Sequence, residues 1–327
     1  MFKSILVPLD GTPVAEAAIE VAIGTAAVSR ASIDLVLVHD PVSVGAMEVA
    51  PWNEDRWATQ CEYLNGVSER TALRTLSLVT HAILRGDPAT MICKRATEVH
   101  ADLIIMESRT RTGVARALLG SVADQVLRRT AVSVLMLRSS KRARTQATGS
   151  PAFERILVAQ DGSPESLEVL QPVSDFAHSH NAEIVILRIV EPVPLPVADV
   201  GPFFPHSPSA VDLDATAQLQ DEAERQNARV RVCLERLGNS RIETHVLTEP
   251  SVGHAISEFA RTNGIDAIAM SVHGRGASRI IVGAIADALL RRTSLPILFR
   301  NCRAESSEDF CLTEEELVEQ LPSLPDL

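Results

Sequence analysis

Short apolar runs recur along the chain and alternate with longer stretches in which apolar residues have the spacing of amphipathic helices. Runs of about 4–8 apolar residues between helix-length segments are typical of a parallel sheet covered by helices on both faces. The pattern therefore predicts an α/β protein of the doubly wound kind. The expected strands are Ile5–Leu9, Ile33–His39, Leu76–Leu84, Leu103–Met106, Val132–Leu137, Ile156–Ala159, Ile184–Val190, Ile242–Leu247, Ala267–Met270 and Leu295–Phe299.

The pattern occurs twice. FKSILVPLDGTP, which begins at Phe2, recurs as FERILVAQDGSP at Phe153, and VLRRT at Val126 recurs as LLRRT at Leu289. A duplicated domain explains the length of 327 residues, since domains usually contain about 100–200 residues. The expected organisation is a first domain over 1–140, a basic polar linker over 141–152, a second domain over 153–300, and an acidic tail over 301–327 with a short helix.

Several segments carry signals that start or end helices. Thr12 and Ser163 are each followed by proline, so their hydroxyls are expected to cap helices that begin with proline. Asp212 or Asp214 can begin a long helix that Gly238 ends. In the tail, a capping box over residues 313–316 predicts the short helix.

Composition and charge exclude several classes of function. A net charge of −11 and a pI near 5.3 argue against a general nucleic-acid binder. The apolar runs are too short to span a bilayer, and the amino terminus lacks the order of regions of a signal peptide. The five cysteines form no CxxC pair, so we expect reduced thiols in a cytoplasmic protein. From the charge and the short apolar runs, we expect neither nucleic acid nor a membrane as a partner.

Candidate chemistry lies directly after the expected strands, where open parallel sheets bind ligands. Asp10 and Asp161 each begin an Asp-Gly-[Thr/Ser]-Pro turn, and such a carboxylate can hold a ribose hydroxyl or a metal-bound phosphate, or simply shape the turn. Gly86 would admit a flat ring close to the backbone, although a plain turn before a helix has the same sequence. Gly120 and Ser121 offer N–H groups and the positive end of a helix to an anion, although a plain helix start has the same sequence.

Catalysis and metal binding are not predicted. Lys3, Lys94 and Lys141 all stand outside a GK[ST] context, which excludes a P-loop NTPase. His178 and His180 are two positions apart on an expected helix and do not share a face, which argues against a metal site. No Ser-His-Asp order and no paired-carboxylate spacing is present, so we expect that the protein is not an enzyme.

The motifs are more informative in their order than singly. ILVPLDGT, GDPA, ADLIIM, GVARALLGS and VLRRT make the first half resemble the universal stress protein family, and ILVAQDGS, DAIAMSVHGRG and LLRRTSLPILF do the same for the second. The resemblance implies two tandem adenine nucleotide α-hydrolase-like domains, each with a five-stranded parallel sheet in the order 3-2-1-4-5. It also implies that the fifth strands of the two halves pair as an intramolecular pseudo-dimer, with a further homodimer left open.

One branch of that family binds adenine nucleotide, which implies ATP or AMP, with or without Mg, as the ligand. The residues that correspond to its site are Pro8, Asp10, Val38, Gly86, Pro88, Gly113, Gly120, Ser121, Asp161, Ile189, Gly274 and Gly283. Glu107, Thr110 and Ser271 stand where the phosphate motif has glycine. Like charges at about 4 Å in an effective dielectric near 20 repel by roughly 4 kcal/mol, so Glu107 disfavours a triphosphate more than AMP.

The resemblance therefore implies a stress-response protein that binds adenine nucleotide as a sensor or regulator without efficient catalysis, and that acts on protein partners the sequence does not identify. The alternative is a scaffold of the same fold that binds no nucleotide and acts through protein contacts. The loop Pro192–Pro208 and the acidic tail are the candidate contact segments. An ATP-cleaving enzyme is disfavoured because SGGxDS, HxGH and KMSKS-like motifs are absent.

Overall fold

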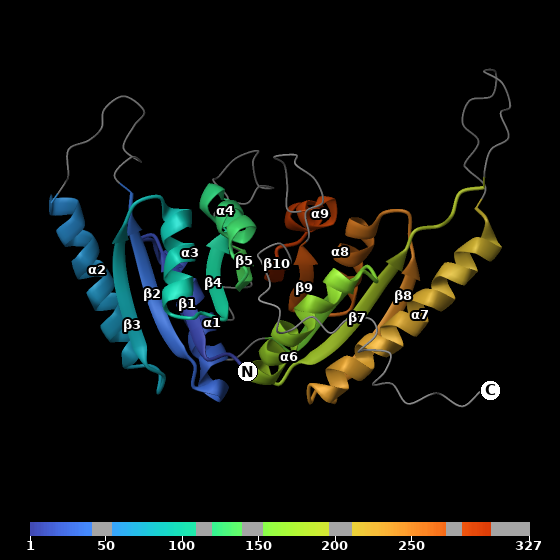
Figure 1. The fold of residues 1–327 in the computed structure, drawn as a ribbon, viewed down its shortest axis with the longest axis horizontal. Coiled ribbons are helices and arrows are strands. Elements are labelled where there is room, and N and C mark those ends of the chain that lie inside the picture. The colour runs from blue at the N-terminus through green and yellow to red at the C-terminus, as the bar shows by residue number, and fades with distance from the viewer. Residues whose placement is uncertain (41–53, 109–119, 139–152, 196–210, 273–282, 302–327) are drawn as a thin grey trace, which may run out of the picture.

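The computed structural model describes residues 1–40, 54–108, 120–138, 153–195, 211–272 and 283–301 (Figure 1). The predicted linker, residues 302–327 of the acidic tail with its short helix, and residues 196–208 of the predicted contact loop lie outside the described residues. Asn301, the first residue of the predicted tail, is the last residue of the last strand that the structure describes. Within them, each apolar run contains one strand, which confirms the α/β prediction. The sequence predicts the third strand from Leu76, but it begins only at Val79. Leu76 and Leu78 precede it, and both side chains are exposed.

The two halves repeat the same order of elements. The first consists of β1 (Ser4–Leu9), α1 (Pro13–Ser29), β2 (Ser32–His39), α2 (Glu54–Ala72), β3 (Val79–Arg85), α3 (Pro88–Glu98), β4 (Leu103–Ser108), α4 (Ser121–Arg129) and β5 (Ser133–Arg138). The second consists of β6 (Arg155–Gln160), the short 3-10 helix η1 (Pro164–Val169), α6 (Leu170–His180), β7 (Glu183–Val190), α7 (Leu213–Arg236), β8 (Ile242–Thr248), α8 (Val252–Thr262), β9 (Ala267–Val272), α9 (Ala284–Arg292) and β10 (Ile297–Asn301).

Among the described residues, those predicted to begin and end helices do so in the structure. The Thr12 hydroxyl accepts a hydrogen bond from the Ala15 amide at 3.4 Å, and the Asp212 carboxylate accepts one from the Ala215 amide at 3.0 Å. Gly238 has a φ of +92°, which favours glycine, and lies just after the end of α7. Ser163 also caps its helix, but that helix starts as the 3-10 turn η1 before α6 continues it.

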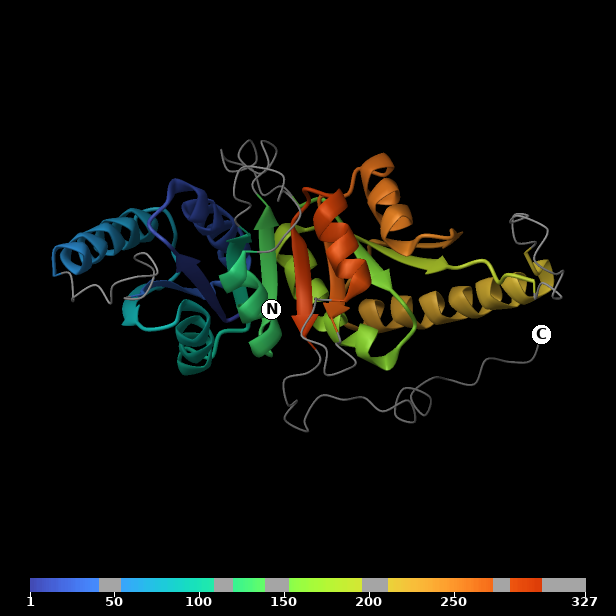
Figure 2. The same ribbon diagram turned by 90° about the horizontal axis from the view of Figure 1, so that it is seen from above.

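All ten strands form one sheet in the order β3-β2-β1-β4-β5-β10-β9-β6-β7-β8. Each half thus has the predicted strand order, and parallel pairing holds within it. The two halves join through β5 and β10, which pair antiparallel with Val134 opposite Phe299 and Met136 opposite Ile297. Figure 2 shows these two strands side by side and pointing in opposite directions, as the expected pseudo-dimer requires.

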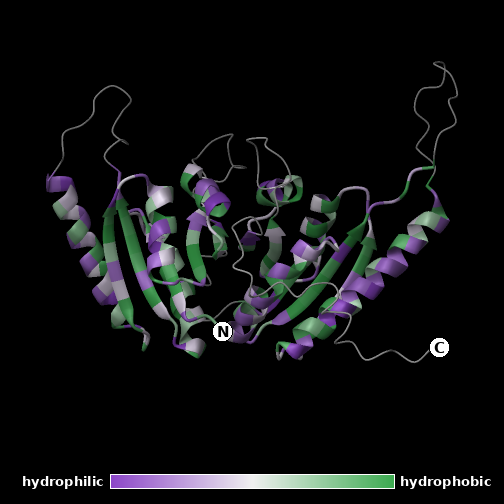
Figure 3. Ribbon diagram, viewed as in Figure 1, coloured by the Kyte–Doolittle hydropathy of each residue, from purple (hydrophilic) through white to green (hydrophobic). Residues whose placement is uncertain are grey.

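Helices cover both faces of the sheet. Buried residues of α1, α2, α6 and α7 pack on one face, and those of α3, α4, α8 and α9 pack on the other. Hydrophobic residues concentrate along the strands, whereas the outer helices α2 and α7 also carry many hydrophilic residues (Figure 3). Both core layers contain residues from both halves, so the core continues across the junction. In the described part of the chain, no helix has the length and apolar character needed to cross a membrane.

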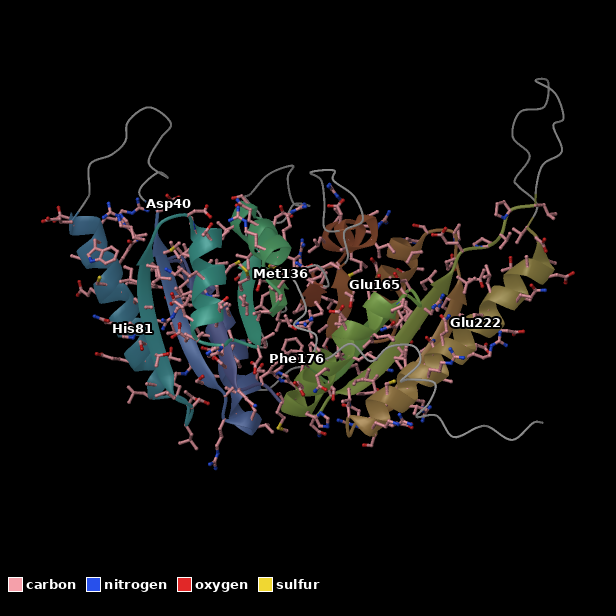
Figure 4. The ribbon with its side chains drawn as sticks, viewed as in Figure 1. Asp40, His81, Met136, Glu165, Phe176 and Glu222 are labelled. Carbon is pink, nitrogen blue, oxygen red and sulfur yellow. The ribbon has the colours of Figure 1, made fainter. Side chains whose placement is uncertain are left out.

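A buried histidine lies where α1 and α6 meet. His180 is only 8% exposed, and its Nε2 is 3.0 Å from the hydroxyl of Thr25 on α1. Because that hydroxyl already donates to the Val21 carbonyl, the histidine Nε2 donates to it. The rings of Phe153 and Phe176 pack against the imidazole, near the middle of the molecule (Figure 4). Burial lowers the pKa of His180 to about 4.

The buried His180 predicts acid sensitivity. The unfolded chain takes up a proton near pH 6.5 and the folded chain only near pH 4, so the free energy of unfolding falls as the pH drops through this window. The full effect is on the order of 3 kcal/mol. In His180→Phe, urea unfolding midpoints should depend less on pH between 4 and 6.5. An unchanged slope would show that other groups control the acid response.

A buried ion pair distinguishes the first half from the second. The Arg95 guanidinium on α3 donates to both carboxylate oxygens of Asp34 on β2, at 2.9 and 2.7 Å, and Thr80 donates to one of them at 2.6 Å. The Asp34 carboxylate is 2% exposed. The corresponding positions of the second half hold Val185 and Phe259, both in the same core layer. The same strand–helix contact is therefore an ion pair in the first half and an apolar contact position in the second.

Exchange of this pair should show strong coupling. Arg95→Phe leaves the buried Asp34 carboxylate without its cation and should cost about 3–5 kcal/mol in the free energy of unfolding. Asp34→Val should cost less, because the Arg95 side chain is 22% exposed and also pairs with Glu98 at 3.5 Å. The double variant places the second half's pair in the first half and should lie within about 1 kcal/mol of the wild type. Urea denaturation of the four proteins measures the cycle. Additive losses would refute the idea that the two pairs are interchangeable.

Lys94→Ala is a matched control for the same experiment. Lys94 lies beside Arg95 in the sequence and pairs with Glu98 at 3.9 Å, but its side chain is 65% exposed. Exposed pairs of this kind contribute about 0–1 kcal/mol. Its removal should therefore leave the unfolding midpoint nearly unchanged.

Candidate functional site

Asp10 and Asp161 shape the turns that follow the first strand of each half. One Asp10 oxygen accepts hydrogen bonds from the Thr12 amide at 3.0 Å and hydroxyl at 2.5 Å. Asp161 holds Ser163 in the same way, at 2.9 and 2.6 Å. The carboxylates therefore act as turn formers, which was one of the two sequence interpretations. Both aspartates are exposed, so they also present negative charge at the edge of the sheet.

The residues expected to flank an adenine ring lie at adjacent strand ends. Val38 on β2 pairs in register with the end of β3, and the Gly86 amide donates to the His39 carbonyl at 3.1 Å. Gly86 has a φ of +138°, a conformation that L side chains rarely adopt. Pro88 begins α3 directly afterwards. Since β1, which contains Pro8, pairs with β2, the turn at Asp10 lies beside this group.

Arg129 is a member of this edge that the sequence did not reveal. The Asp87 carboxylate accepts from the Thr90 amide at 2.9 Å and from the Arg129 guanidinium at 3.2 Å. The bonds from Thr90, and after them Arg129, hold the pKa of Asp87 below its usual value. Arg129 lies in the last turn of α4 and ties this helix to the turn at Gly86, a long-range contact.

The start of α4 offers backbone donors. Gly120 is its N-cap residue and supplies no side-chain hydrogen bond, so the first amides of α4 lack a side-chain cap. Ser121 is exposed at the first helical position. Gly283 and Ala284 repeat this arrangement in the second half without the hydroxyl. The positive end of such a helix can receive a phosphate or another anion.

Two further groups border the Asp10 turn. Tyr63 on α2 donates to a Glu16 oxygen at 2.9 Å, and burial, with help from Glu16 and Asp10, raises the pKa of Tyr63 well above its ordinary value. Glu107 is half-buried near the end of β4, and β4 is the other neighbour of β1. Glu107 adds a negative charge near the carboxyl end of β4, where a ligand with fewer phosphates would be repelled less.

The turns of the two halves differ in the space above their glycines. A methyl group added to Gly11, which has a φ of +83°, would meet no atom of the described residues within 4 Å. At Gly162 the same methyl group would collide with the side chains of Arg188 and Gln226, with the Arg188 Cζ only 2.6 Å away. The first turn is therefore open among the described residues, and the second is covered.

The remaining predicted residues are divided between the described and the undescribed parts. In the second half, Ile189 lies near the end of β7 in register with Leu247, and Ser271 lies on β9 and is buried. Gly113, Gly274 and Thr110 lie outside the described residues. Within the described ranges, no group of three or more His, Cys, Asp or Glu side chains could hold a metal ion.

The first-half edge suits a nucleoside that carries little negative charge. Among the described residues, Gly11 leaves room above the turn, and α4 offers amides to one phosphate. At Gly86 the Met91 side chain already packs where a Cβ atom would lie, with its Cγ 3.4 Å away. Asp10 is an acceptor for ribose hydroxyls.

Comparisons with known proteins agree with the fold. A family model described as the universal stress protein family matches residues 1–138 and again 152–299. A putative universal stress protein of Staphylococcus aureus (strain USA300) is 31% identical over 143 residues, which is 43% of this chain and 86% of that protein.

Two solved structures cover both halves. A universal stress protein from Archaeoglobus fulgidus DSM 4304 superposes with a TM-score of 0.64 at 18% identity, over 91% of this chain and 98% of that chain. A putative universal stress protein from Pseudomonas aeruginosa UCBPP-PA14 gives 0.63 at 17% identity, over 92% and 93%. These likenesses concern the fold alone.

Proposed function

The chain belongs to the universal stress protein family, and on that basis we propose that its first half binds an adenine nucleotide, ATP or AMP, as a sensor or regulator without efficient catalysis. The observation that carries this proposal is the difference between the two turns. In the part of the chain that the structure describes, Gly11 leaves space beside Asp10, whereas Arg188 and Gln226 cover Gly162 beside Asp161. The first half thus offers the more open place for a ribose and its phosphate.

AMP is the better candidate of the two nucleotides. The amides at the start of α4 can receive one phosphate, and Asp10 can accept from the ribose. A triphosphate would bring further negative charge toward Glu107, at a cost of roughly 4 kcal/mol for charges about 4 Å apart. A divalent cation such as Mg would have to offset this repulsion for ATP to bind equally well.

A ligand bound at the carboxyl ends of the first-half strands would affect more than one helix. Arg129 connects α4 to the Asp87 turn, so a ligand between the turn and the start of α4 would contact elements that are already coupled. Such a ligand would stabilise one arrangement of α3 and α4, and protein partners that recognise this arrangement would bind more tightly. The cytoplasmic location and a homodimer stay predictions.

Asp10→Asn should weaken AMP binding at least about tenfold, because the neutral amide is a poorer acceptor for ribose hydroxyls. Asp161→Asn makes the same change in the second half and is the matched control, for which affinity should not change. The measurement is calorimetric titration of protein freed of bound nucleotide, after chromatography of the supernatant from heat-denatured samples. A clean supernatant together with no heat up to millimolar AMP or ATP–Mg would favour the scaffold alternative.

Glu107→Gln tests the choice between nucleotides. Removal of this charge should increase the affinity for ATP–Mg relative to AMP by about tenfold or more, because the repelled phosphates are those that AMP lacks. The ratio of the two dissociation constants, measured at low salt, is the readout. An unchanged ratio would mean that the Glu107 side chain is too far from the phosphates to select between them.

A further inference from the structure

Arg188 occupies a position that is apolar in the other half. Leu9 pairs with Leu37 at the end of β1, and Gln160 pairs with Arg188 at the end of β6, so Leu37 and Arg188 are equivalent positions. Leu37 is 1% exposed and belongs to the core. Its replacement by arginine puts a long charged side chain beside the strand-end turn of the second half only.

The guanidinium is fixed over the turn by its neighbours. Arg188 donates to the Gln226 side chain on α7, and Gln226 in turn donates to Glu222 at 3.0 Å. Burial lowers the pKa of Arg188, and the negative charges of Asp161 and Glu222 only partly offset this effect. Figure 4 shows Glu222 on α7, the helix that holds this chain of side chains. The arginine thus has polar partners on the turn side and on the helix side.

We propose that Arg188 is the resident occupant of the second half's strand-end turn, so that the chain has one nucleoside-binding position, in its first half; this rests on the proposed binding of nucleotide by this fold. The guanidinium fills the space above Gly162, whereas no atom of the described residues fills the equivalent space above Gly11. It also places a positive charge near the Asp161 carboxylate, whose counterpart Asp10 is the proposed acceptor for the ribose. Arg188 therefore determines which half is specific for the ligand.

The consequence is a division of labour within the duplicated chain. The second half has the same strand order and pairs with the first through β10, but the Arg188 side chain occupies the place of a ligand at its turn. It supplies a constant partner for the first half, whose turn alone responds to nucleotide. A titration should therefore give one equivalent of AMP per chain.

The test opens the second turn in a chain whose first turn is weakened. Arg188→Leu installs the residue of the first half, and it is made in the Asp10→Asn background so that binding by the second half stands out. Adenosine is the probe, because Ser271 and Ala284 alter the part of the second half that would meet phosphates. Methyl NMR of Ile189 reports the second half, and methyl NMR of Val38 reports the first.

The double variant should bind adenosine about tenfold or more tightly than Asp10→Asn alone, with shifts at Ile189 and not at Val38. Arg188→Ala, which removes the guanidinium without adding bulk, is a second variant in case leucine itself fills the turn. Urea unfolding midpoints of both variants verify that the chain folds. If neither folded variant binds while the wild type binds one AMP, the role of Arg188 is refuted and the proposed function stands.

Other outcomes separate the two ideas. Two equivalents of AMP on the wild type, with shifts at both Ile189 and Val38, would refute the role of Arg188 and support nucleotide binding. No binding by the wild type together with binding by Arg188→Leu would support the role of Arg188 and refute the assignment to the first half. Absence of binding by every protein would refute both.

Discussion

The antiparallel pairing of β5 with β10 is the constraint on which the rest of the molecule depends. Without it, each half would expose the backbone of its fifth strand as an unpaired edge, a risk for aggregation. Pairing turns two sheets into one and leaves β3 and β8 as the edges. It also brings equivalent elements together, so that α1 packs on α6 and Asn301 donates to three carbonyls around the end of α4. The halves therefore share one core.

Within that shared core, the two halves have diverged in a limited set of positions. The features that fix the backbone are repeated, as in the turns at Asp10 and Asp161. Other side chains near these turns and in the core differ in charge between the two halves. An open turn stands beside Leu37, and its counterpart is covered by Arg188. Duplication has thus kept the fold in both copies while it left the two strand-end turns chemically different.

Local signals explain how much of this could be predicted from the sequence. Buried strands appear as apolar runs because both faces of the sheet are covered, and caps such as Thr12 act on amides three residues away. The contacts of Arg129 with Asp87 and of His180 with Thr25 span 42 and 155 positions, and no periodicity encodes them. The covering of Gly162 had one signal in the sequence, the arginine at 188 where the first copy has leucine.

The ion pair of Asp34 with Arg95 has a consequence for how a duplicated chain avoids folding incorrectly. Two similar domains in tandem can exchange equivalent helices while they fold, which is a known failure of repeat proteins. If α3 packed on the second half's sheet, Arg95 would face Val185, and if α8 packed on the first, Phe259 would face Asp34. The second exchange buries the Asp34 carboxylate without a cation, at a cost of several kcal/mol, and the first gives up the ion pair that Arg95 makes with Asp34. The pair therefore disfavours exchanged packing relative to the packing of each helix on the sheet of its own copy.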